Sequence, residues 1–282
     1  MSKKTKVWLI LAATLMGIGC IAFAGVMTVL HWDFTNLTTH KFETSEFVIP
    51  EEYHNISVST KTANIVFLPS ENAETTVICY EQQNMTHAVS VKDGTLQIQV
   101  EDTRKWYEYI GISFRCPKIT VYLPQGEYNA LSVKSITGNI EIPKDFAFQS
   151  VDLSVSTGDI SVSGVTCSGD VAVYVTTGNA TITDLQCKNL TTAGTTGDLY
   201  MRNVVAAQMF SAERNTGDIT LERCDATELY LKTTTGHVTG SLLSQKVFTV
   251  SATTGRIEVP QNTGGGKCKI HTTTGNIKIT LE

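Results

Sequence analysis

The sequence lacks the motifs that mark the common enzyme classes. It contains no G-x-S-x-G, H-E-x-x-H, P-loop or dinucleotide-binding motif, and its six histidines are scattered. No C-x-x-C pair or cysteine–histidine spacing indicates a metal site. We therefore predict that the chain is not an enzyme and that it has no catalytic residues, no metal and no cofactor.

Charged residues are also scarce, and most of them are negative. They make up 17% of the 282 residues, and Thr, Ser, Asn and Gly take their place, which is typical of β-rich chains with many turns. The net charge is −5, and without Lys3, Lys4 and Lys6 there remain 19 basic residues against 27 acidic ones. This balance argues against a nucleic-acid partner, which requires a basic surface.

No helical periodicity is found after Leu30, but one long apolar run ends at this residue. Residues 1–6 form a basic tip, and residues 7–30 carry no charge. About 20 apolar residues cross a bilayer, and basic residues favour the cytoplasmic side. We predict a single-pass anchor in the cell membrane, with the N-terminus cytoplasmic and the bulk of the chain extracytoplasmic. A cleaved signal peptide is the main alternative, and lipoprotein processing at Cys20 is another.

A hexapeptide with an invariant Thr-Gly pair occurs eight times, in steps of 19 or 20 residues. A fixed period of this size indicates a stacked-repeat architecture. We expect the glycine to form a sharp corner and the threonine to form a structural ladder of hydroxyls. The pairs are Thr137, Gly138, Thr157, Gly158, Thr177, Gly178, Thr196, Gly197, Thr216, Gly217, Thr235, Gly236, Thr254, Gly255, Thr274 and Gly275.

Apolar residues alternate on both sides of each Thr-Gly pair. They lie seven and five residues before the glycine and two and four residues after it. Burial with a period of two on both sides of a tight turn predicts two short strands per coil. We therefore predict an all-β fold: a single-strand-stack β-solenoid, similar to a parallel β-helix, with coils of 19–20 residues and one N-terminal transmembrane helix before it.

The solenoid is expected to fill residues 47–282, after a juxtamembrane linker at residues 31–46. Residues 47–130 read as a degenerate first coil, whose KTANI carries Ala63 in place of glycine, followed by a cap of β-hairpins. Asp93-Gly94 is a hairpin signal within this cap. Residues 131–282 read as eight regular coils.

The opening ISVSTKTANIVFLPS and the recurrent TTGDI and TTGNI sequences resemble the bacterial putative-adhesin family, a domain of unknown function built as a TTG-repeat β-solenoid. The resemblance covers roughly residues 47–282. It implies a protein of the bacterial envelope, often beside a membrane anchor and in settings tied to envelope stress. It brings no catalytic residues to this sequence.

The segment RKWYEYIGISF, residues 104–114, concentrates aromatic side chains beside basic ones. Such loops contact glycans, peptides or lipid headgroups. The alternative is that the rings fill the core of the capping hairpins. The candidate binding residues are Arg104, Lys105, Trp106, Tyr107 and Tyr109.

Three further features have both a functional and a structural interpretation. The column of residues that follow the glycines, which includes Asp159, Asp198 and Asp218, could hold a cation, but we favour turn-forming residues that face solvent. Arg214 lies at a position that is occupied by much smaller residues in the other coils. We expect a local bulge to turn its side chain outward. Cys167 and Cys187 fall in the same slot of adjacent coils, and we favour two buried thiols over a disulfide.

The last coil ends at Glu282 with no closing element, so we expect it to be an open sheet edge for self-association or partner docking. The preferred function is a non-enzymatic, adhesin-like interaction scaffold at the cell surface, with a protein or glycan partner. An envelope-stress sensor that signals through a membrane partner is the alternative. A carbohydrate-active enzyme on a β-helix scaffold is a remote one.

Overall fold

The computed structural model describes residues 2–34, 41–72, 74–109, 115–144, 146–261 and 264–282. The chain divides into two compact units. One combines Met1–Phe42 with Arg104–Cys116, and the other combines Glu43–Thr103 with Pro117–Glu282.

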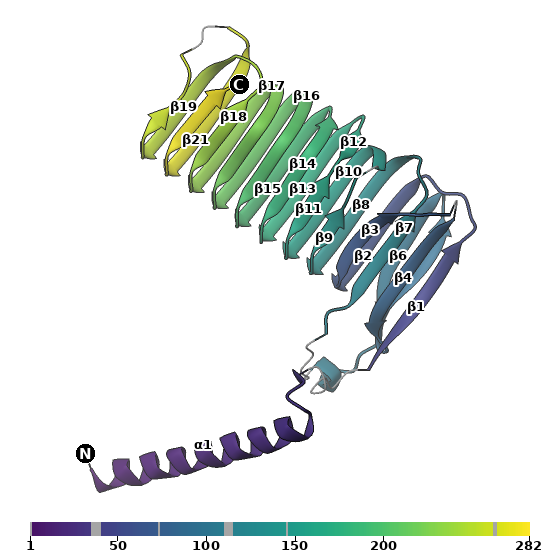
Figure 1. Cartoon of the computed structure of the whole chain (residues 1–282), viewed down its shortest axis with the longest axis vertical. Helices are drawn as coiled ribbons and strands as arrows, with labels where there is room; N and C mark the ends of the chain where they lie inside the picture. Colours follow the sequence, from purple (N-terminus) through teal and green to yellow (C-terminus); the bar gives the residue numbers. More distant parts are fainter. Residues whose placement is uncertain (1, 35–40, 73, 110–114, 145, 262–263) are drawn as a thin grey trace. The chain divides into compact units, whose positions relative to one another are not determined.

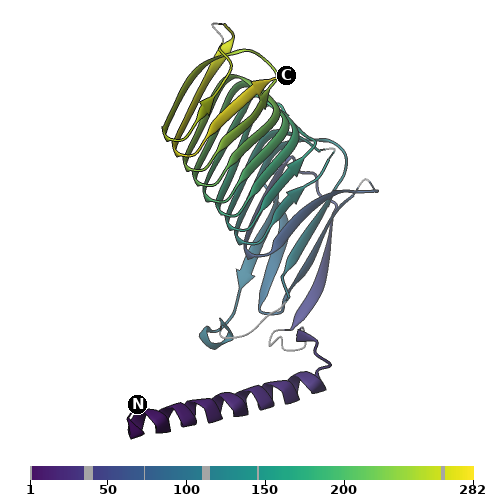
Figure 2. The ribbon, with the colours of Figure 1, turned by 60° about the vertical axis from the view of Figure 1, so that its left-hand side comes forward.

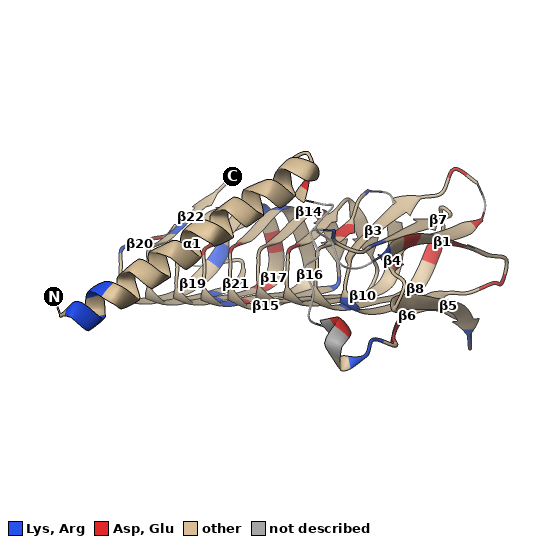
Figure 3. Ribbon diagram, turned by 90° about the horizontal axis from the view of Figure 1, so that it is seen from below, with Lys and Arg blue, Asp and Glu red and all other residues tan. Residues whose placement is uncertain are grey.

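The first unit contains a long apolar helix, α1 (Lys3–Val29), and a short 3₁₀ turn, η2 (Trp106–Tyr109). The Ser2 side chain caps α1 by accepting a hydrogen bond from the Thr5 N–H. The helix has a window of mean hydropathy 2.3 with none of it buried, so its length and composition are sufficient to cross a membrane. Its basic residues gather at the N-terminal end (Figure 3). The prediction of one N-terminal apolar helix is confirmed.

The second unit is a β-solenoid, as predicted, in which two parallel ladders of strands meet at the Thr-Gly corners (Figures 1 and 2). Its strands before and after the corners are β2 (Asn55–Thr62), β3 (Asn64–Pro69), β8 (Glu127–Thr137), β9 (Ile140–Ile142), β10 (Phe146–Thr157), β11 (Ile160–Ser163), β12 (Val165–Cys167), β13 (Asp170–Thr177), β14 (Ala180–Cys187), β15 (Asn189–Thr196), β16 (Leu199–Thr216), β17 (Ile219–Thr235), β18 (Val238–Leu242), β19 (Lys246–Thr254), β20 (Ile257–Glu258), β21 (Gly266–Thr274) and β22 (Ile277–Leu281).

The N-terminal end of the solenoid is closed by strands that extend both ladders. These are β1 (Phe42–Ile49), β4 (Thr75–Gln82), β5 (Met85–Lys92), β6 (Thr95–Asp102) and β7 (Lys118–Leu123). Strand β6 pairs in parallel with β2, and β7 with β3. Strands β5 and β4 then add antiparallel to β6 and β7 respectively, and β1 pairs with β4. Strand β1 begins at Phe42, inside the stretch expected to be a linker.

The Thr-Gly corner brings consecutive coils into close backbone contact. Gly158 has a φ of 139°, and a Cβ added to it would lie 2.2 Å from the carbonyl oxygen of Gly138. A side chain is therefore excluded both by the backbone conformation and by the neighbouring coil. The predicted role of the glycine as a corner agrees with this geometry.

The residues after the glycines form a continuous hydrogen-bonded ladder. The Asp159 N–H donates to Asn139 Oδ1 at 2.9 Å, and the Asn179 N–H donates to Asp159 Oδ1 at 2.7 Å. The same contact recurs up the stack, through His237 Nδ1 and Asn276 Oδ1. The threonines before the glycines are exposed. They nevertheless pair in register from coil to coil, as Thr157 does with Thr177. The ladder of their hydroxyls stays a prediction, whereas the side chain after the glycine is seen to accept the N–H of the next coil.

The last two coils stack in the reverse of their order in the sequence. Strand β21 pairs with both β17 and β19, and β22 pairs with both β18 and β20. The chain thus skips one level after β18, forms the outermost coil with β19 and β20, and returns to fill the gap (Figure 1). The prediction that the final coil is an open edge is wrong, since it is paired on both sides.

Side-chain burial agrees with this order. The apolar residues in the four predicted core slots are buried, apart from Phe248, Val250, Ile257 and Val259, which are half-buried or exposed. All four belong to the coil formed by β19 and β20. The open end of the hydrophobic core therefore lies at residues 246–259.

We predict that Ile277→Ala destabilises the solenoid much more than Ile257→Ala does. The two residues occupy the same slot, but Ile277 is fully buried whereas Ile257 is 41% exposed. The first change should cost about 2–4 kcal/mol and the second less than about 1 kcal/mol. Denaturant unfolding of the two variants measures the difference. Equal costs would contradict the reversed stacking order.

We also predict that Asn179→Ala lowers the free energy of unfolding by about 1 kcal/mol, because the Asp198 N–H loses its acceptor. Arg256→Ala is the matched control, since Arg256 stands in the outermost coil and its side chain accepts no bond from a further coil. Thermal unfolding compares them, and a control as unstable as Asn179→Ala would count against the ladder.

Candidate functional site

The aromatic–basic segment predicted to bind a partner lies in η2 and the residues before it. The Glu108 carboxylate accepts a hydrogen bond from the Lys105 N–H at 2.8 Å, and the Glu108 N–H donates to the Lys105 carbonyl at 2.9 Å. These contacts close the 3₁₀ turn. Trp106 is 77% exposed, so its ring does not fill a core.

The other members of this segment are described less completely. Arg104 is half-buried and Lys105 is exposed. The backbone of Tyr107 and Tyr109 lies within η2, but their side chains and residues 110–114 fall outside the described part of the chain. The consecutive residues Arg104, Lys105 and Trp106 lie in the same compact unit as α1.

The carboxylates in the column of residues after the glycines accept backbone hydrogen bonds between coils. Asp159, Asp198 and Asp218 each accept the backbone N–H of the following coil, at 2.7–2.8 Å. Turn residues that stabilise the stack account for this column, in agreement with the structural interpretation of it. One oxygen of each carboxylate, Oδ1, therefore serves the ladder.

Arg214 points inward, contrary to the expectation that a bulge would turn it outward. It is only 3% exposed, and its three guanidinium nitrogens have no hydrogen-bond partner among the described residues. It pairs in register with Gly194, where an added Cβ would lie 1.8 Å from Arg214 Nη1. The missing side chain in the neighbouring coil therefore makes room for the guanidinium. Burial lowers the pKa of Arg214.

Cys167 and Cys187 are buried and lie on the paired strands β12 and β14, as their shared slot predicts. Both are free thiols. Burial raises the pKa of Cys187 to about 12, so this group stays protonated at neutral pH. These two cysteines are part of the hydrophobic core.

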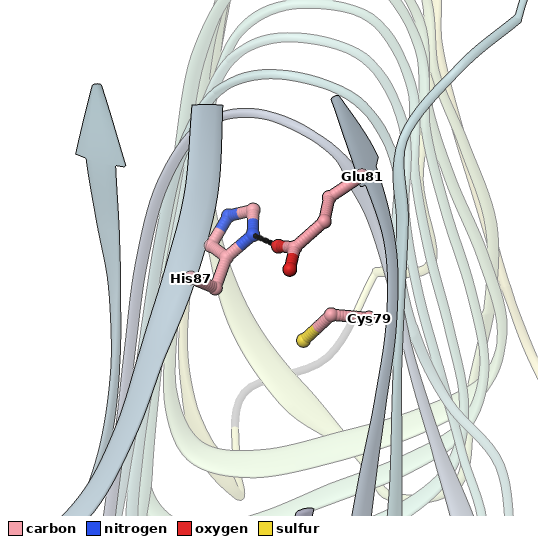
Figure 4. Close-up of side chains that lie close together, drawn as sticks. All are labelled: Cys79, Glu81 and His87. Carbon is pink, nitrogen blue, oxygen red and sulfur yellow. Dashed lines mark hydrogen bonds and ion pairs between the residues drawn. The ribbon is translucent and has the colours of Figure 1, made fainter. Parts of the chain in front are cut away.

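A polar cluster that the sequence analysis missed lies inside the N-terminal cap. Cys79 and Glu81 point from β4, and His87 points from β5, toward one another (Figure 4). One donor atom from each residue lies within 4.8 Å of the others. The three residues are 0%, 1% and 3% exposed respectively.

Hydrogen bonds fix the imidazole of His87 on both sides. Its Nδ1 lies 2.7 Å from Glu81 Oε2, and its Nε2 lies 2.8 Å from the hydroxyl of Thr60 on β2. Burial and the nearby Glu81 carboxylate raise the pKa of Cys79 to about 12. Within the described residues, this is the cluster of Cys, His and acidic groups whose atoms could share one metal ion.

Sequence spacing gave little indication of this cluster. Cys79 and Glu81 have the i, i+2 spacing that places two residues on one face of a strand, but His87 follows after a turn. The prediction of no metal site considered only familiar motifs. A signal was nevertheless present, because polar residues stand at positions of β4 and β5 where the alternation predicts burial.

Comparison with known proteins identifies a family model and solved structures that this chain resembles. The family model described as Toastrack DUF4097 matches twice, over residues 53–169 and 166–282. The two matches together span the solenoid and its cap, apart from β1. Among curated proteins, none matches this chain.

Two solved structures illustrate the similarity. A putative adhesin from Bacteroides fragilis is 18% identical with a TM-score of 0.54, over 85% of this chain and 97% of that one. A putative lipid binding protein from Parabacteroides distasonis is 14% identical with a TM-score of 0.49, over 86% and 98% respectively. The first of these shows a shared fold. The residues matched by the family model cover most of the chain, which therefore belongs to the Toastrack DUF4097 family.

Proposed function

We propose that this chain is a membrane-anchored, non-enzymatic interaction scaffold of the cell surface, adhesin-like in character. In this proposal α1 holds the protein in the cell membrane, and the solenoid is a rigid extracytoplasmic rod. The Bacteroides fragilis structure described as a putative adhesin shares the fold. We extend that description to this chain as part of the proposal.

The exposure of Trp106 is the observation that carries the binding part of the proposal. An indole that is 77% exposed beside Arg104 and Lys105 offers a large apolar face, a hydrogen-bond donor and positive charge in one place. Tryptophan and arginine are the residues most often found as interaction hot spots. We propose that residues 104–109, Tyr107 and Tyr109 included, contact a protein or glycan of the envelope.

The placement of this segment in the same compact unit as α1 supports a binding surface close to the membrane. A strand-based fold with a continuous apolar core supplies rigidity rather than a reaction centre. A rigid rod keeps its surface fixed without a loss of conformational entropy on binding. Both features favour a scaffold.

For the anchor, we expect the full chain to remain in the membrane fraction after an alkaline wash, and a variant that lacks residues 1–30 to be released. Mass spectrometry of the purified full chain should find residues 1–30 still attached. A mature mass that starts after the apolar run would instead establish a cleaved signal peptide and refute the anchor.

For binding, we expect Trp106→Ala with Tyr107→Ala to weaken binding of the full chain in nanodiscs to purified peptidoglycan or to extracted envelope proteins at least tenfold. Loss of a hot-spot tryptophan typically costs about 2 kcal/mol or more. Tyr174→Ala is the matched control, because Tyr174 is an exposed aromatic residue of the solenoid. The proposal fails if the double variant binds as well as the control, or if it loses binding only because its Tm has collapsed.

A further inference from the structure

We propose that Cys79, Glu81 and His87 form a zinc site that holds together the N-terminal cap of the solenoid. The three side chains converge from β4 and β5 in the interior of the cap (Figure 4). They offer one sulfur, one oxygen and one nitrogen donor, with each residue at most 3% exposed. Nothing in the proposed scaffold function depends on this site.

The donor set fits Zn²⁺ in its chemistry. Zinc binds thiolate, imidazole and carboxylate, at about 2.3, 2.0 and 2.0–2.2 Å. A carboxylate does not suit Cu(I), which prefers soft sulfur ligands, and a thiolate does not suit Mg²⁺ or Ca²⁺. The mixture of Cys, Glu and His therefore favours zinc over these other ions.

The geometry requires only small movements of side chains. Tetrahedral zinc would separate its ligand atoms by about 3.3–3.6 Å, and the three donor atoms already lie within 4.8 Å of one another. The distance from His87 Nδ1 to Glu81 Oε2, now 2.7 Å, would lengthen to about 3.3 Å as the ion replaces the hydrogen bond. The cysteine sulfur would close in from the other side.

Thr60 supplies the outer contact that a zinc-bound histidine usually has. When His87 Nε2–H donates to the Thr60 hydroxyl, at 2.8 Å, the lone pair of Nδ1 faces Glu81 and Cys79. In that tautomer the contact holds the ring in the orientation needed for Nδ1 to bind the ion. The hydroxyl lies on β2, in the coil that the cap covers.

Charge balance gives a reason for zinc to bind in this interior. A thiolate, a carboxylate and a neutral imidazole carry two negative charges, which one Zn²⁺ neutralises. Zinc binds the thiolate form of cysteine, so binding displaces the proton of the Cys79 thiol. Because the site is closed to solvent, the ion must enter before the cap has folded.

The ion would join two strands that are otherwise weakly connected. Strand β4 belongs to the ladder of β7, and β5 to the ladder of β6, while β4 and β5 share a single registered pair, Gln82 with Met85. Ligands from both strands would close this open hairpin over the end of the core. Removal of zinc should therefore loosen the cap.

The test uses the full chain in detergent, produced in zinc-supplemented cells and purified without chelators. We expect about one zinc per chain by mass spectrometry of the metal content. After unfolding with a chelator, refolding with Zn²⁺ should give a Tm roughly 5–10 °C above refolding without it. Refolding with Co²⁺ should produce the near-ultraviolet absorption of a thiolate–cobalt bond. This absorption shows that a cysteine binds the metal, and it is measured on the unmutated chain.

Cys79→Ser and His87→Gln should lose the zinc, and Thr60→Val should weaken its binding about 10–100-fold. Cys224→Ser is the matched control, because Cys224 is equally buried but lies outside the cluster. A purified chain with less than a tenth of an equivalent of zinc and no zinc-dependent change in Tm overturns the proposal. Retention of zinc by both Cys79→Ser and His87→Gln overturns it as well.

Discussion

The close approach of backbones at the Thr-Gly corner is the constraint on which the rest of the solenoid depends. An added Cβ at Gly178 would lie 2.1 Å from the carbonyl oxygen of Gly158, and its φ of 134° is a conformation that other residues rarely adopt. Because the corner can be turned in only this way, the next strand always leaves in the same register. The parallel pairing of successive coils, such as Thr157 with Thr177, follows from it.

The corner also explains how the backbone groups of the turn are satisfied. The amide after each glycine points toward the preceding coil of the stack, where the Asn, Asp or His at the same position accepts its hydrogen bond. The side chain at this one position thus supports the turn and links the levels of the stack. We expect function where the regular repeat ends or is interrupted. These places are the cap, residues 104–109 and the open coil formed by β19 and β20.

The cap differs from the coils in what it buries. The coils fill their interior mostly with apolar residues, with Arg214 as an exception, whereas the cap places Glu81 and His87 together where the alternation of β4 and β5 calls for apolar side chains. Burial of these groups requires partners for each of them. That requirement makes the cluster a specific feature of the cap rather than a consequence of the solenoid repeat.

The sequence by itself determined the repeat, the corner glycines, the buried slots and the apolar helix, because each depends on residues close together in the chain and on a period that local sterics impose. Tertiary structure alone decided the order of the last two coils. All coils share one period and the same apolar slots, so stacking in either order satisfies the local rules. Arg256, which cannot accept an N–H, stands at the open end, and Gly265 and Gly266 let the returning chain pass beside the backbone of Gln245 and Thr227. The inward turn of Arg214 and the meeting of Cys79, Glu81 and His87 were also decided by the tertiary structure, because each depends on which side chains a neighbouring strand places alongside.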